Sequence, residues 1–117
     1  MQQDEIAVVA APVGEIDAQR SQAMGRAANR YLAVARIRAL LLDLSAADYL
    51  DEEAVAWLLG LWRDASRRGV RLAVAGARPV VAQKLTRLGL HTLLSVYEDV
   101  AAARSALLAA DAPARAR

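Results

Sequence analysis

The sequence predicts a single α/β domain in which a largely parallel or mixed β-sheet carries helices packed on it. Short apolar runs alternate along the chain with longer segments of helical periodicity, in the order strand then helix, four times over. The connections between these segments are short, which favours strands joined through packed helices. A length of 117 residues with 56% hydrophobic residues is enough for one core.

The first half of the chain contains two predicted strands and two predicted helices. Residues 5–13 form an apolar strand, and a turn at residues 14–17 leads to Asp17, which can cap a helix over residues 18–35. A second strand covers residues 39–44. After an acidic loop, residues 52–68 form a second helix, whose apolar stripe is Val55, Leu58, Leu59 and Trp62.

The second half repeats the pattern. Residues 70–75 form a strand, Pro79 suits the first turn of a helix that ends near Leu88, and residues 90–96 form a last short strand. Asp99 then caps a final helix that ends near Ala110. We therefore expect one domain over residues 1–111 and a disordered C-terminal tail over residues 112–117.

The composition argues against several classes of function. Without cysteine the chain has no disulfide, no thiolate nucleophile and no Cys-based metal site. A net charge of +2 with scattered basic residues argues against nucleic-acid binding, and no apolar run approaches a membrane span. The six glycines are dispersed and form no phosphate-binding loop. His91 is the single histidine, and its position indicates a turn residue. We expect a cytoplasmic protein without a cofactor or a metal.

The acidic segment, residues 43–53, is the most informative part of the chain. It holds Asp43, Asp48, Asp51, Glu52 and Glu53 between a buried strand and a helix. Asp51 as N-cap and the two glutamates in the first turn would stabilise the helix, each by roughly 0.3–1 kcal/mol. Helix capping and the helix dipole do not explain Asp43 and Asp48. A carboxylate pair such as Asp43 and Asp51 could hold Mg²⁺, but nothing nearby supplies a substrate-binding element.

Trp57 has two interpretations. Its position between Val55 and Leu58 places it at the edge of the buried face of its helix. It is either a core residue or an exposed anchor for a protein partner beside the acidic segment, and the sequence does not separate the two.

Several short motifs, in order and spacing, resemble the STAS domain family, typified by bacterial anti-sigma factor antagonists. They are Gly14-Glu15-Ile16-Asp17, Leu41-Leu42-Asp43-Leu44-Ser45, Tyr49-Leu50-Asp51, Arg68-Gly69-Val70-Arg71-Leu72 and Leu88-Gly89-Leu90. The resemblance covers residues 6–108, and residues 76–82 also resemble the stressosome branch. It implies a mixed sheet of about four or five strands, with about four helices packed on it.

The resemblance further implies a regulator that binds protein partners and catalyses nothing. In the family, a Ser or Thr after the residue equivalent to Asp51 is phosphorylated by an anti-sigma factor that is also a serine/threonine kinase. Here that residue is Glu52, which cannot accept phosphate and carries less charge than phosphoserine. Asp17, Asp51, Glu52, Glu53 and Trp57 are the predicted partner-binding residues, with Asp43 supporting the loop.

An alternative is a structural assembly subunit, either in a stressosome-like scaffold or as the STAS component of a transport complex. Its partners would then include other STAS proteins. Few residues precede Ile6, so the first strand of many members would be short or missing and would leave a free sheet edge. A homodimer is one expected use of such an edge.

Overall fold

The computed structural model describes residues 5–34 and 37–116. Its main sheet has the strand order β1 (Glu5–Ala10), β3 (Ile37–Asp43), β5 (Arg71–Ala75) and β6 (Ser95–Tyr97). Two more strands, β2 (Gly14–Ile16) and β4 (Ala47–Leu50), form a small second sheet. Every pairing between the described strands is parallel. The predicted α/β class is confirmed.

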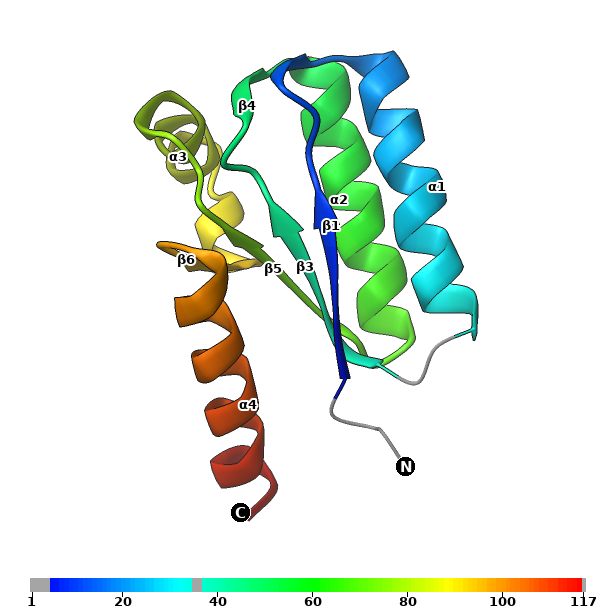
Figure 1. Cartoon of the computed structure of the whole chain (residues 1–117), viewed down its shortest axis with the longest axis vertical. Coiled ribbons are helices and arrows are strands. Elements are labelled where there is room, and N and C mark those ends of the chain that lie inside the picture. The colour runs from blue at the N-terminus through cyan, green and yellow to red at the C-terminus, as the bar shows by residue number, and fades with distance from the viewer. Residues whose placement is uncertain (1–4, 35–36, 117) are drawn as a thin grey trace.

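The described part of the chain also contains four α-helices: α1 (Ala18–Val34), α2 (Glu52–Arg67), α3 (Pro79–Arg87) and α4 (Val100–Ala116). A short 3₁₀ helix, η1 (Leu90–Thr92), follows α3. Figure 1 shows α1 and α2 side by side against the sheet, α3 beside β4, and α4 apart from them near β5 and β6. All four predicted helices are therefore present.

The alternation of side chains along the strands divides the core between the two faces of the sheet. Leu40 and Leu42 of β3 belong to the larger cluster, which α1, α2 and α3 cover. Leu41 points the other way and packs with Ala103 and Leu107 of α4. The central strands are buried on both faces, which is why they read as continuous apolar runs.

The structure corrects four details of the prediction. Residues 14–16 and 47–50, expected as a turn and a loop, form β2 and β4. The predicted strand over residues 90–96 begins with η1, and only residues 95–97 pair with β5. The first strand ends at Ala10, not at residue 13.

Two predicted boundaries concern the C-terminal ends of α4 and α1. Helix α4 continues to Ala116, beyond its predicted end near Ala110, and the boundary at residues 111–112 stays a prediction. The predicted last residue of the first helix, Ala35, lies outside the described residues.

Candidate functional site

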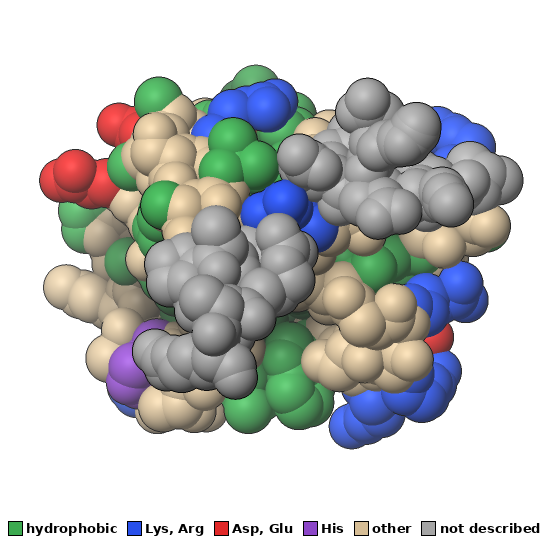
Figure 2. All heavy atoms as spheres, turned by 90° about the horizontal axis from the view of Figure 1, so that it is seen from below, with side chains coloured by type: hydrophobic (Ala, Val, Ile, Leu, Met, Phe, Trp, Pro, Cys, Tyr) green, Lys and Arg blue, Asp and Glu red, His purple; other side chains and the backbone are tan. Residues whose placement is uncertain are grey.

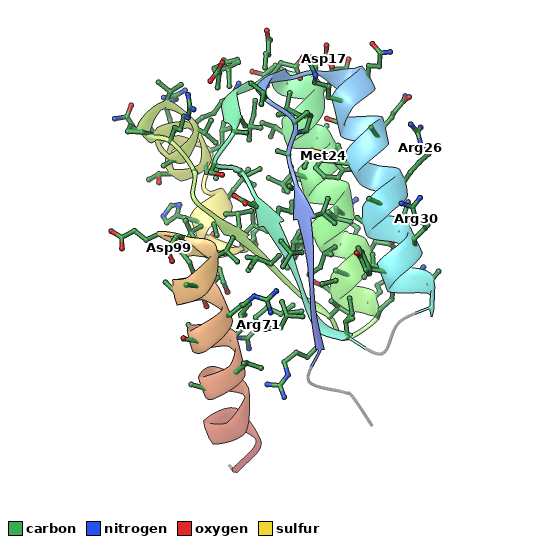
Figure 3. The ribbon with its side chains drawn as sticks, in the orientation of Figure 1. Asp17, Met24, Arg26, Arg30, Arg71 and Asp99 are labelled. Atoms are coloured by element: carbon green, nitrogen blue, oxygen red, sulfur yellow. The ribbon has the colours of Figure 1, made fainter. Side chains whose placement is uncertain are left out.

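The small β2–β4 sheet brings the starts of α1 and α2 to the same edge of the molecule. Each of these strands leads directly into a helix, and the Asp51 N–H donates to the Ile16 carbonyl at 3.2 Å. Asp17 therefore lies beside the acidic segment, as the upper part of Figure 3 shows. The structure thus brings four of the predicted residues together, namely Asp17, Asp51, Glu52 and Glu53.

The aspartates of this edge are engaged by the backbone of their own turns. Asp17 Oδ1 accepts from the Arg20 N–H and Asp51 Oδ1 from the Ala54 N–H, both at 2.9 Å, so each caps a helix as predicted. Asp43 Oδ1 accepts from the Ser45 N–H at 3.0 Å and holds the turn between β3 and β4. This hydrogen bond fixes the local turn that follows β3.

Gly76 allows the loop after β5 to pass close to that turn. Its φ of +76° lies in the left-handed region, and an added Cβ would stand 3.1 Å from Ser45 Cβ and 3.3 Å from Asp43 Oδ1. A side chain here would be strained in its backbone and crowded by the turn. Gly76 therefore positions the loop that carries Arg78.

The two glutamates differ from the aspartates because their side chains extend into solvent. Glu52 is the first residue of α2, and its side chain is 87% exposed. Glu53 is also exposed. Both lie in the first turn of α2, where negative charge is favourable to the helix dipole.

Lys84, the only lysine of the chain, approaches the acidic segment from α3. Its side chain is 4% exposed, and its ammonium donates to the Leu50 carbonyl at 2.6 Å and to the Tyr49 hydroxyl at 2.9 Å. The same nitrogen lies 4.2 Å from the centre of the Tyr49 ring and 3.6 Å from Glu52 Oε2. A buried cation thus faces the exposed carboxylate of Glu52 at the start of α2.

The hydrogen bond to Tyr49 raises the pKa of Lys84 above the usual 10.5. Burial acts in the opposite direction because it penalises the charged form, and the charge of Glu52 adds to the rise. The ammonium therefore remains protonated throughout the physiological pH range.

Arg78 forms a second link between α3 and the acidic segment. It precedes α3, and its guanidinium donates to Asp48 Oδ1 at 2.8 Å and to the Ser45 carbonyl at 3.1 Å. Both partners of this ion pair are more than half exposed, so the contribution of the pair to stability is about 0–1 kcal/mol. This contact accounts for Asp48, which helix capping did not.

Lys84 and Arg78 were not predicted from the sequence as members of this site. One signal was available for Lys84, which occupies a position of the apolar stripe of its helix, with Val81 and Leu85. Val13, which is 76% exposed, was not predicted either. Val13 lies beside the acidic segment because the next residue, Gly14, donates its N–H to the Ala46 carbonyl at 3.1 Å.

Trp57 lies more than one turn further along α2 and is half-buried against α1. Its indole Nε1 would be 2.9 Å from a Cβ added at Gly25, so the missing side chain of that glycine leaves room for the N–H edge of the ring against α1. Trp57 is therefore both a packing residue and a partly accessible one.

No grouping of three or more His, Cys, Asp or Glu side chains suited to a metal ion occurs within residues 5–34 and 37–116. In the same residues, no helix is long and apolar enough to cross a membrane. Asp43 and Asp51, the pair considered for a metal, each serve a separate turn.

Comparison with known proteins identifies the family. The model of the STAS domain matches residues 1–103. No match is found among curated proteins. Among solved structures, a Ser-to-Glu variant of RsbS from Moorella thermoacetica is 26% identical, with 96% of this chain and 92% of that chain covered and a TM-score of 0.74.

Two further structures are similar in fold. A putative anti-sigma factor antagonist from Thermotoga maritima is 17% identical, with 86% of each chain covered and a TM-score of 0.75. The STAS domain of a SulP transporter from Vibrio cholerae is 24% identical, with 97% of this chain and 86% of that chain covered and a TM-score of 0.71. With the family match over most of the chain, these findings establish that the protein belongs to the STAS domain family.

Proposed function

We propose that this protein is a non-catalytic regulator, similar to anti-sigma factor antagonists, that binds a protein partner in a bacterial partner-switching pathway. The partner would be an anti-sigma factor of the serine/threonine-kinase kind or another STAS protein. The proposed contact surface consists of Asp17, Asp51, Glu52, Glu53 and Trp57, with Asp43 holding the adjoining turn.

The position and exposure of Glu52 carry this proposal. The residue directly follows the N-cap Asp51, and its side chain is 87% exposed at the edge where α1 and α2 begin. A carboxylate there offers a partner a fixed negative charge. Glu52 would therefore act as a permanent but partial imitation of phosphoserine, which carries about −1.5 to −2 and three acceptor oxygens.

Lys84 supports this interpretation. Its ammonium is 3.6 Å from Glu52 Oε2 and is held in place by two hydrogen bonds to β4. An anion at position 52 therefore has a nearby cation from α3, whereas a serine hydroxyl would leave that cation without an anionic neighbour. The surroundings of position 52 thus favour the acidic residue.

Replacement of Glu52 by Ser tests the proposal. Glu52→Ser should bind a kinase-type anti-sigma factor more tightly than the wild type, measured by calorimetry, and should become phosphorylated at position 52 by that kinase with ATP. Glu53→Ser is the matched control, because it removes the neighbouring exposed carboxylate and should gain neither property. Equal or weaker binding by Glu52→Ser would mean that Glu52 does not imitate phosphate.

The alternative proposal is a structural assembly subunit. It is favoured by the similarity to RsbS and to the STAS domain of a SulP transporter, and by the resemblance of residues 76–82 to the stressosome branch. Strand β1 also lies at an edge of the four-stranded sheet in the described part of the chain, which suits a homodimer. Light scattering tests the self-assembling form of this alternative, since a strict monomer at micromolar concentration would exclude a self-assembling scaffold.

A further inference from the structure

Gly60, in the middle of α2, has no role that the fold explains. It is exposed, it has no positive φ, and a Cβ added there would meet nothing within 4 Å. Glycine in a helix interior costs about 0.5–1 kcal/mol relative to alanine. Gly25, on the facing helix, is explained by the close approach of Trp57. A contact between Gly60 and another molecule would explain the missing side chain.

Gly60 lies in a groove between α1 and α2. One hollow of this groove is lined by Asn29, Trp57, Gly60, Leu61, Arg63, Asp64 and Arg67. A second hollow shares Asn29 and Trp57 and continues along α1 past Gly25 and Arg26, so the lining of the two hollows carries three basic side chains and one acidic side chain. We call this surface the α1–α2 groove. Its apolar part is the half-buried Trp57 and the buried Leu61.

The rim of the α1–α2 groove is basic. Arg26 and Arg63 are exposed and have no ion-pair partner among the described residues, whereas Arg67 pairs with Asp64 at 2.7 Å. Figure 3 shows Arg26, and Arg30 one turn further along α1, extending into solvent. The view from below in Figure 2 shows further basic side chains on the side of the molecule that carries α1.

We propose that the α1–α2 groove is a docking site for an acidic amphipathic segment of a protein partner. Carboxylates of that segment would pair with Arg26 and Arg63, and an apolar side chain would pack on Trp57 through the gap left at Gly60. A protein segment suits this groove better than a nucleic acid does. The groove offers one half-buried aromatic ring in place of a series of stacking platforms, and the net charge of the chain is only +2.

The proposal goes beyond the function proposed above, because it adds a groove between α1 and α2 that shares only Trp57 with the first surface. Gly60 is eight positions from Glu52, about 12 Å along the helix axis. A partner in the α1–α2 groove would therefore contact this protein whatever residue occupies position 52.

Nuclear magnetic resonance on the full ¹⁵N-labelled chain tests the proposal. The probe is a short synthetic peptide with Glu and Leu at helical spacing, and the comparison peptide has Lys at every Glu position. We expect the acidic peptide to shift the amide signals of Gly25, Asn29 and Gly60 and the indole signal of Trp57. The double variant Arg26→Glu/Arg63→Glu should weaken binding by about tenfold or more, and added salt should weaken the binding of the acidic peptide to the wild type.

Two more variants separate the groove from general charge effects. Arg104→Glu reverses one charge at an exposed position of α4, as each of the two groove substitutions does, and should leave the affinity unchanged. Gly60→Leu fills the gap and should abolish the indole shift. The proposal is overturned if the shifts fall outside the groove, if the acidic peptide causes none, or if oligo(dT) binds these residues more tightly than the acidic peptide.

Discussion

Lys84 provides the sharpest test of how α3 is attached to the acidic segment. Lys84→Met keeps the length and apolar character of the side chain and removes only its ammonium. Two hydrogen bonds are lost, and the Leu50 carbonyl is left without this donor in a buried position. The Tyr49 hydroxyl belongs to a residue that is 39% exposed, so water can replace its lost partner.

The expected loss of stability follows from these contacts. A buried acceptor left without its partner lowers the stability by about 1–3 kcal/mol. Removal of a buried charge offsets part of this loss, because the charge no longer has to be desolvated. We expect a net destabilisation of about 1–3 kcal/mol. Glu52→Gln should cost only about 0.2–1 kcal/mol, because that carboxylate is 87% exposed and solvent screens its pairing with Lys84.

Urea unfolding of the wild type, the two single variants and the double variant measures both effects. For a slope of about 1–3 kcal/mol per molar urea, a loss of 2 kcal/mol lowers the midpoint by about 1 M. The coupling between Glu52 and Lys84 should not exceed about 1 kcal/mol. A Lys84→Met protein as stable as the wild type, or a Glu52→Gln protein as unstable as Lys84→Met, would refute this account.

The remaining predictions concern pH and the groove. The raised pKa of Lys84 means that its contribution to stability is fully present below about pH 10.5, the unfolded value, and is lost as pH rises through the higher folded value. Urea midpoints between neutral and strongly alkaline pH should show this loss in the wild type but not in Lys84→Met. Gly25→Ala should destabilise by about 0.5–2 kcal/mol, because its Cβ would stand 2.9 Å from Trp57 Nε1. Gly60→Ala should instead stabilise the fold by about 0.5–1 kcal/mol. Thermal unfolding of both variants measures these changes in stability. Changes of the opposite sign would contradict the packing argument.

The elements with strong local signals could be predicted from the sequence. Helix α2 begins after the cap residue Asp51, as the sequence indicated, and Asp17 and Asp99 accept backbone N–H bonds at the starts of α1 and α4. These interactions join residues within one turn of each other. Their geometry therefore depends on the local sequence and little else.

Strands β2 and β4 could not be predicted, because each forms only by pairing with the other. Residues 47–50 have buried ends and two exposed residues between them, which is not the alternation typical of a strand. Their pairing partner, residues 14–16, lies on the far side of α1 in sequence. The same reason applies to Lys84, whose hydrogen-bond partner Tyr49 is 35 residues away.

Stability and function place different demands on α2, and Gly60 shows where they diverge. The helix dipole and the N-cap account for acidic residues in the first turn and for Arg67 in the last. They do not account for an exposed helical glycine beside a half-buried tryptophan, nor for a buried lysine directed at an exposed carboxylate. At Gly60 alanine would serve the fold better. Gly60 is thus a residue that folding alone would replace, so a stabilised Gly60 variant that loses binding would locate that function on this helix.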